Sequence, residues 1–144
     1  MEVSVRQLTE SWFERVWNQH DRSAVADLMH EDCEVLGLGN TVAGPSGFLK
    51  IYESFVAAFD QIHVDIVDLV AEGEEVAGHA RFAARHLRSG KEVDLIFSFS
   101  GQFEERKLRR VRNVVDHTSL MAQLDLLEPE RMQLIFEAPD KPVR

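Results

Sequence analysis

The spacing of apolar residues divides the chain into a helical first part and a strand-rich second part. Up to about residue 60, apolar residues recur every three or four positions, as on the buried face of a helix. This spacing predicts helices in "VRQLTESWFERVWNQHD", in "DRSAVADLMHEDC" with Asp21 as its N-cap, and from Pro45 to Phe59. Between the last two, "CEVLGLG" predicts a short strand followed by a glycine-rich loop.

From residue 62 onward, apolar and polar residues alternate, which is typical of strands with one buried face. Turn signals at Glu72–Glu75, Ser89–Gly90 and Glu105–Arg106 divide this part into four long antiparallel strands joined by short hairpins. A last helix is predicted at about 117–127. Helices followed by grouped strands favour an α+β domain with the helices on one face of a curved sheet.

The chain has 144 residues, 44% of them apolar, which suits a single domain that we expect to span residues 1–127. Residues 128–144 are expected to form a partly loose extension, in which "RMQLIF" is an extra strand or a contact for a partner. No apolar run approaches the roughly 20 residues that cross a bilayer, and no secretion signal is visible. Cys33 is the only cysteine, which excludes an internal disulfide. We therefore expect a cytoplasmic protein.

The net charge of −9 argues against nucleic acid or an anionic membrane as the partner. One basic cluster, "RKLRRVR" at 106–112, is open to three interpretations: a strand with solvated charges, an anion site for a small ligand, or a nucleic-acid contact. The histidines are scattered and show neither HxxxH nor HExxH spacing. We therefore expect no metal and no other cofactor.

Asp116 lies between the end of a predicted strand and the predicted last helix. Its carboxylate can cap that helix, be exposed by chance, or stand in a pocket and transfer protons. If Glu105–Arg106 is a two-residue turn, the cross-strand pairs are Leu95 with Asp116, Phe97 with Val114, and Phe99 with Arg112. Asp116 and Arg112 would then lie on the apolar face under the helices, whereas a slip of one residue would reverse the two faces.

Three stretches of the chain resemble the SnoaL-like polyketide cyclase family of the nuclear-transport-factor-2-like superfamily, which includes the ketosteroid isomerases. They are "FERVWNQHDRSAVADLMHEDCEV", "GPSGFLKIYESFVAAFDQIHVDIVDLVAEGEEVAG" and "DHTSLMAQLDLL", within residues 10–127. The resemblance implies a cone-shaped barrel, in which a strongly curved, mostly antiparallel sheet wraps on three N-terminal helices around a pocket. It also implies a homodimer formed through the outer sheet face, and chemistry without metal or cofactor.

The family pattern D-x-x-x-L-x-x-Q-L is matched by Asp116, Leu120, Gln123 and Leu124. The resemblance implies that Asp116 is the acid/base residue in a ring closure next to a carbonyl group. His86 matches a histidine that is often found at the end of the third sheet strand in this family. Because burial among apolar side chains strengthens a carboxylate as a base, a pocket position would suit this role.

The chain departs from the family pattern at Arg110 and Arg112, where an acidic residue and a tryptophan are common, and the loop between His86 and Val93 is shorter. On the predicted register Arg112 makes the pocket more basic, which suits a smaller, anionic ligand rather than a tetracyclic one. The candidate catalytic residues are therefore Asp116 and His86, and the candidate pocket residues are Arg112, Tyr52, Phe97, Phe99, Leu95, Phe55 and Phe13.

Three functions remain open, because one fold can host all of them. The first is a cofactor-independent cyclase, isomerase or lyase that acts next to a carbonyl. The second is a domain that binds a small hydrophobic or anionic ligand without catalysis, and the third is a dimerisation domain with a vestigial pocket. A homodimer is expected because the outer sheet surface is too apolar for a plain solvent face. This expected surface consists of Ile96, Ser98, Ser100, Val111 and Val115.

Overall fold

A computed structural model describes residues 3–139 as an α+β fold built on one six-stranded sheet. The elements in chain order are α1 (Val5–Trp12), the π-helix η1 (Phe13–Asn18), α2 (Ser23–Leu28), β1 (Met29–Leu36), β2 (Val42–Ala43), α3 (Gly44–Ala58), β3 (Phe59–Glu72), β4 (Glu75–His86), β5 (Glu92–Glu104), β6 (Lys107–Val115), α4 (His117–Gln123) and the 3-10 helix η2 (Pro129–Phe136). The strand order is β2-β1-β6-β5-β4-β3, and all pairs are antiparallel except β1 with β6.

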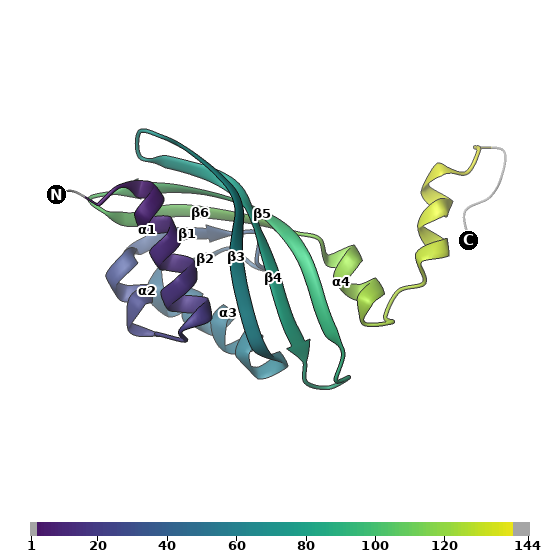
Figure 1. The fold of residues 1–144 in the computed structure, drawn as a ribbon. Helices are drawn as coiled ribbons and strands as arrows, with labels where there is room; N and C mark the ends of the chain where they lie inside the picture. The colour runs from purple at the N-terminus through teal and green to yellow at the C-terminus, as the bar shows by residue number, and fades with distance from the viewer. Residues whose placement is uncertain (1–2, 140–144) are drawn as a thin grey trace.

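The curved sheet wraps around the N-terminal helices, and the C-terminal segment extends away from the body of the protein (Figure 1). The predicted order of helices and strands is confirmed. Four details differ: the first helix continues as a π-helix, the second helix ends at Leu28 so that residues 29–33 lie in β1, a two-residue strand forms in the glycine-rich loop, and "RMQLIF" lies in a 3-10 helix rather than a strand. None of the helices in residues 3–139 is long and apolar enough to span a membrane.

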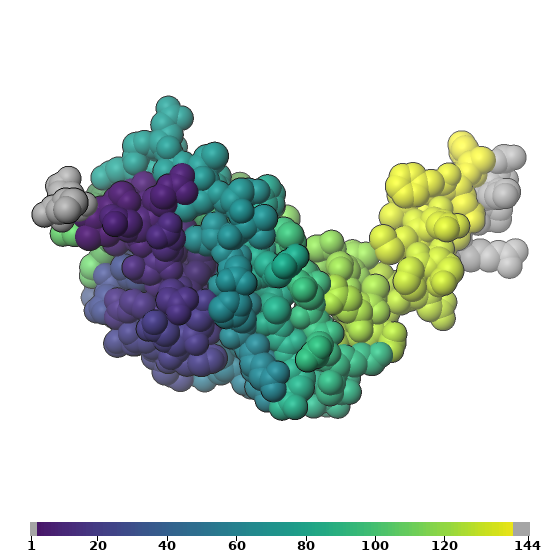
Figure 2. All heavy atoms as spheres, viewed as in Figure 1, coloured from purple at the N-terminus to yellow at the C-terminus, as the bar shows by residue number. Residues whose placement is uncertain are grey.

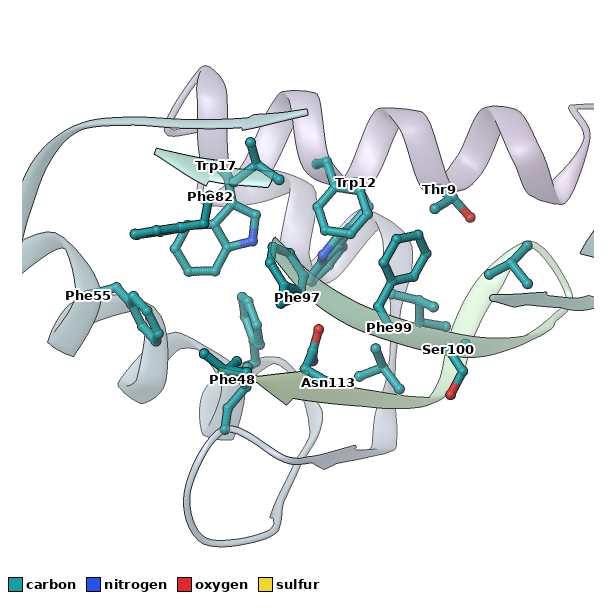
Figure 3. Close-up of a pocket in the computed structure, with 18 of the residues that line it drawn as sticks. Thr9, Trp12, Trp17, Phe48, Phe55, Phe82, Phe97, Phe99, Ser100 and Asn113 are labelled. Atoms are coloured by element: carbon teal, nitrogen blue, oxygen red, sulfur yellow. The ribbon is translucent and has the colours of Figure 1, made fainter. Parts of the chain in front are cut away.

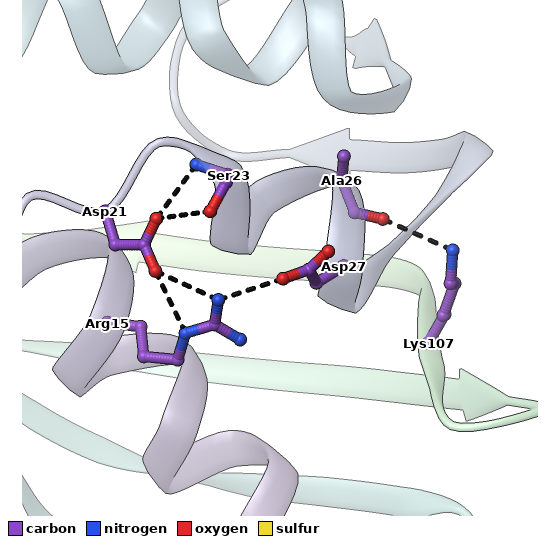
Figure 4. Close-up of polar contacts among 6 residues, drawn as sticks. All are labelled: Arg15, Asp21, Ser23, Ala26, Asp27 and Lys107. Atoms are coloured by element: carbon purple, nitrogen blue, oxygen red, sulfur yellow. Dashed lines mark hydrogen bonds and ion pairs between the residues drawn. The ribbon is translucent and has the colours of Figure 1, made fainter.

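Polar contacts hold the short helix α2 in place between η1 and β6 (Figure 4). The Arg15 guanidinium donates to Asp21 and to Asp27, in both cases at 2.9 Å. Asp21 also accepts the backbone N–H of Ser23 at 3.1 Å. The predicted N-cap at Asp21 is wrong by one residue, because Arg22 is the N-cap of α2 and makes no side-chain cap hydrogen bond. The Ser23 hydroxyl, and then the Arg15 guanidinium, hold the pKa of the Asp21 carboxyl below its usual range. At the other end of α2, Lys107 donates to a backbone carbonyl.

The core lies between the inner face of the sheet and the helices α1, η1 and α3, and aromatic side chains dominate it. Phe48 of α3 meets Trp12 edge to face, with ring centroids 5.0 Å apart, and meets Trp17 at 6.1 Å. Phe13 meets Phe99 of β5 edge to face at 5.0 Å. Such contacts contribute roughly 0.5–1.5 kcal/mol per pair beyond the burial of apolar area. They connect the helices to the strand that forms one wall of the candidate site.

The register of β6 departs from the predicted one at a single residue, Arg109. The predicted turn is confirmed, since Glu105 and Arg106 have φ angles of 51° and 70° and Phe103 pairs with Leu108. Beyond Leu108 the register shifts, because Arg109 is an extra residue that bulges from the ladder. The pairs that follow are Gln102 with Arg110, Ser100 with Arg112, Phe99 with Asn113, Ser98 with Val114, and Phe97 with Val115.

This β-bulge reverses the two faces of β6, so the prediction that Arg112 and Asp116 lie on the inner face was wrong. Val111, Asn113 and Val115 face inward, whereas Arg112 is exposed and Val114 is 63% exposed on the outer face. The predicted outer surface is corrected in the same way, since Val111 and Val115 do not belong to it. The bulge keeps two arginines in water and turns Val111 and Val115, which are partly buried, toward the core while it exposes Val114; the arginines are the main physical reason to prefer the shifted register.

Candidate functional site

The helices and the curved sheet enclose a cavity of about 100 Å³ with almost wholly apolar walls (Figure 3). Its aromatic walls include Trp12, Phe13, Phe48, Phe55, Phe97 and Phe99. An apolar cavity of about 150 Å³ in an engineered protein binds benzene. The enclosed space here is therefore on the scale of one small ring, and a larger ligand would extend through the mouth. The mouth is marked by wall residues that are only partly buried, among them Phe55, Phe97, Val115 and Leu120.

Few polar side chains reach this cavity. The Thr9 hydroxyl is buried and already donates to the Val5 carbonyl at 2.8 Å. The Ser100 hydroxyl points away from the cavity, whereas the Asn113 carboxamide points into it (Figure 3). Within residues 3–139 no side chain or backbone group hydrogen-bonds to that carboxamide. Both its N–H donors and its oxygen are thus free to contact a ligand.

His117 is the one ionisable residue in the cavity wall of the described chain. It is the first residue of α4 and is exposed at the mouth, one helical turn before Leu120. An imidazole at the opening of an apolar cavity can reach a ligand inside and still exchange protons with water. The cavity therefore combines apolar walls, one free amide and one proton-transfer group.

The residues of the D-x-x-x-L-x-x-Q-L pattern hold α4 in position. The Asp116 carboxylate caps α4 by accepting the backbone N–H of Ser119 at 2.9 Å. The Gln123 side chain accepts a hydrogen bond from the backbone N–H of Asp94 and donates one to the backbone carbonyl of Asp94, both at 2.9 Å. These two bonds pair α4 with the part of β5 that lies beyond the end of β6. Leu120 and Leu124 pack against the core. Each matched position thus has a structural role in placing His117 at the mouth.

The structure brings five of the predicted pocket residues together. The cavity wall contains Phe13, Phe55, Leu95, Phe97 and Phe99. Arg112 is not in this wall, because it lies on the outer face opposite Ser100. The expectation that Arg112 makes the cavity basic is therefore wrong for this structure.

The remaining predicted residues also lie outside the cavity wall. Tyr52 is buried, and its hydroxyl is 3.2 Å from Nδ1 of His20; burial raises the pKa of this phenol. His86 ends β4, with Nδ1 2.8 Å from the Ser89 hydroxyl and its ring 5.3 Å from that of Phe59. Asp116 is exposed and caps α4. The proposed catalytic roles of Asp116 and His86 stay predictions.

The sequence interpretation missed Asn113 and His117. Asn113 was assigned to the outer face by the register that the bulge at Arg109 overturns. His117 was grouped with the scattered histidines, although its place next to the matched Asp116 was a usable signal. Burial raises the pKa of the Cys33 thiol to about 11, so this residue stays a protonated thiol and is no nucleophile. Within residues 3–139, no three histidine, cysteine or acidic side chains gather as metal ligands.

Asp116→Ala is expected to lower the free energy of unfolding by about 1 kcal/mol, because it removes the cap of α4. Asp116→Asn is expected to change it by only a few tenths of a kcal/mol, since an amide oxygen caps equally well. Urea unfolding of both variants measures the difference. Equal losses for alanine and asparagine would show that the carboxylate contributes by charge rather than by capping.

Comparison with known proteins places this site in a wider context. A family model described as SnoaL-like polyketide cyclase matches residues 7–124, which include both Asn113 and His117. Among curated protein sequences, none matches the chain.

Several solved structures share the fold. TsrD from Streptomyces laurentii is 18% identical, with a TM-score of 0.78 over 88% of this chain and 100% of its own. IdmH from Streptomyces antibioticus, described as a putative polyketide cyclase, is 16% identical, with a TM-score of 0.78 over 85% of this chain and 99% of its own. AclR from Streptomyces galilaeus, described as a putative hydroxylase, is 21% identical, with a TM-score of 0.74 over 87% of this chain and 100% of its own. At these identities the likeness establishes the fold alone.

Proposed function

The chain belongs to the SnoaL-like polyketide cyclase family, and on this basis we propose that it is a cofactor-independent enzyme for a small, neutral carbonyl compound. The proposed reaction class is proton transfer at the carbon next to the carbonyl, the step that cyclases and isomerases of this kind share. The observation that carries the proposal is the combination of an apolar cavity with a free carboxamide, Asn113, and an imidazole, His117, in its wall.

The cavity favours a neutral ligand over an anionic one. Its described wall contains no arginine, lysine or carboxylate. Transfer of an ionised carboxylate into such surroundings is costly unless a counter-charge accompanies it. Arg110 and Arg112 lie on the other face of the sheet and supply no such charge. Arg112 in the cavity would have favoured an anionic ligand. Because Arg112 lies outside, we propose instead a neutral ligand with one ring in the enclosed space.

The proposed chemistry assigns one task to each polar side chain. His117 accepts a proton from the carbon next to the carbonyl, and the electrons of that C–H bond form a C=C bond while the carbonyl π electrons move to oxygen. Asn113 donates an N–H to this developing enolate oxygen. His117 then returns the proton to carbon, or the enolate carbon attacks a second carbonyl and closes a ring, and the His117 imidazolium gives its proton to the alkoxide oxygen that forms. Histidine is the side chain most often used for such transfers.

Asp116 is the second candidate for the base. The observation in its favour is its match to the acidic position of the family pattern, directly before His117. In the structure its carboxylate is occupied in capping α4, so we propose that it positions His117 rather than contacting the ligand. The two assignments predict different responses to single substitutions at Asp116 and His117.

Acetophenone is a suitable probe of this function, because it has one ring, no charge and a methyl group next to its carbonyl. In D₂O the protein is expected to exchange these methyl hydrogens about 10²-fold faster than buffer alone, the lower end of what general acid–base groups contribute. Proton NMR follows the loss of the methyl signal, and ethylbenzene, which lacks the carbonyl, serves as the control. An exchange rate that the protein does not change would contradict the enzyme proposal.

A further inference from the structure

The C-terminal helix η2 exposes apolar side chains that the rest of the described chain does not cover. Ile135 is 77% exposed and Phe136 is 87% exposed, and Leu126 before the helix is 66% exposed. The hydrogen bonds of this segment are local, such as that from the Glu137 N–H to the Leu134 carbonyl. Figure 2 shows the segment standing clear of the domain. Large exposed apolar side chains grouped in this way mark an interaction surface.

The outer face of the sheet carries a groove of about 580 Å³ that is suited to such a segment. Two cross-strand rows form it, and in both rows β5 supplies an uncharged residue at the floor. The first row is Val70, Ala77, Ser100 and Arg112, and the second is Glu72, Glu75, Gln102 and Arg110. The groove is therefore shallow and uncharged in the middle, acidic at its β3–β4 side and basic at its β6 side.

We propose that η2 of one copy of the chain lies in this groove of a second copy, within the homodimer expected through the outer sheet face. The groove and the segment lie at opposite ends of the domain, with the β3–β4 turn at the upper left of Figure 1 and η2 at the far right. To reach its own groove, η2 would have to fold back along the length of the domain. A second copy is the partner that carries both surfaces, and it can exchange both contacts symmetrically.

The dimensions of the two surfaces agree. Helix η2 has eight residues, and at a rise of about 2.0 Å per residue it is about 16 Å long. The distance from β3 to β6 is three strand spacings of about 4.8 Å, or about 14 Å. A 3-10 helix laid across the strands thus spans the groove from its acidic to its basic side.

The charges of the two surfaces are complementary. Arg110 and Arg112 form no ion pair within residues 3–139. Glu137 follows the exposed Ile135–Phe136 pair. With Ile135 and Phe136 over the floor of the groove, Glu137 faces the arginines at its basic side. This contact is independent of what the cavity binds.

The test is a disulfide formed between two separately expressed full-length chains, one with Ser100→Cys and the other with Ile135→Cys. The native Cys33 is buried and stays out of the reaction. Mixing and oxidation are expected to give a cross-linked heterodimer in higher yield than a mixture of Ile135→Cys with Glu53→Cys, a control on the exposed surface of α3.

A second measurement uses sedimentation equilibrium. The pair Ile135→Asp and Phe136→Asp is expected to raise the dimer Kd at least 10-fold without changing the circular dichroism spectrum, because both side chains lie off the domain. A monomer at tens of micromolar, with cross-linking no higher than in the Glu53→Cys control, would overturn the proposal. A dimer that keeps its Kd in the Asp variant would overturn it as well, since the sheet faces would then associate without η2.

Discussion

Deletion of Arg109 is expected to lower the free energy of unfolding by no more than about 1 kcal/mol, the scale of an exposed ion pair, because it removes the bulge without turning β6 over. The residue is the extra one in β6, and without it the strand would continue the ladder that pairs Phe103 with Leu108. Gln102 would still pair with Arg110, so Arg110 and Arg112 would stay on the outer face and Val111 would stay inward. Denaturant unfolding measures the loss, which is small compared with the roughly 5–15 kcal/mol that stabilise a typical domain.

Arg109→Ala is the matched control for this deletion, because it keeps the number of residues in β6. The Arg109 guanidinium pairs with Asp32 and lies 3.5 Å from Glu104, and its side chain is 40% exposed. Exposed ion pairs of this kind contribute little, so the alanine variant is expected to unfold close to the wild-type midpoint. If the deletion were several kcal/mol less stable than Arg109→Ala, β6 could not keep its faces in a regular ladder, which would contradict this register.

His117→Gln is expected to reduce proton exchange on acetophenone by about 10²-fold, to the rate in buffer alone, because glutamine cannot accept the proton from carbon. The side chain is exposed at the mouth of the cavity, so the fold is expected to survive the substitution. The rate is measured by the loss of the methyl signal in D₂O, at ligand concentrations that give both kcat and KM. Loss of a proton-transfer group lowers kcat and leaves the apparent affinity nearly unchanged.

Asp116→Asn is the informative comparison for His117→Gln. It keeps the capping oxygen of α4 and is therefore expected to retain at least half of the wild-type rate. The reverse result, in which Asp116→Asn loses the activity and His117→Gln keeps it, would assign the base to the residue that the family pattern implies. Loss of activity in both variants, with α4 intact, would mean that the two side chains act together.

The elements that the sequence predicted well are those that local rules determine. Each N-terminal helix has an apolar stripe at helical spacing, and each hairpin has residues suited to its turn, such as Gly73 with a φ of 60°. The five predicted residues that line the cavity lie on these stripes or on strands upstream of the bulge. Their positions needed no knowledge of contacts between distant segments.

The errors arise where distant residues decide the local structure. The bulge places Arg109 beside Asp32 of β1. Strand β1 pairs with β6 in parallel, and the spacing of apolar residues along the chain does not reveal that pairing. Because a strand has a side-chain period of two, this single extra residue moved every later prediction on β6 to the wrong face. Asn113 was missed for this reason, and Arg112 was placed in the cavity for the same reason.

The central claim is that the apolar cavity binds a neutral carbonyl compound with its oxygen at Asn113. A crystal structure of the protein with acetophenone tests it most directly, and benzoate provides the matched anion. We expect the acetophenone ring in the cavity against its aromatic wall, its carbonyl oxygen within hydrogen-bond distance of the Asn113 amide, and no benzoate in the cavity. An empty cavity with acetophenone, or benzoate bound inside it, would contradict the claim.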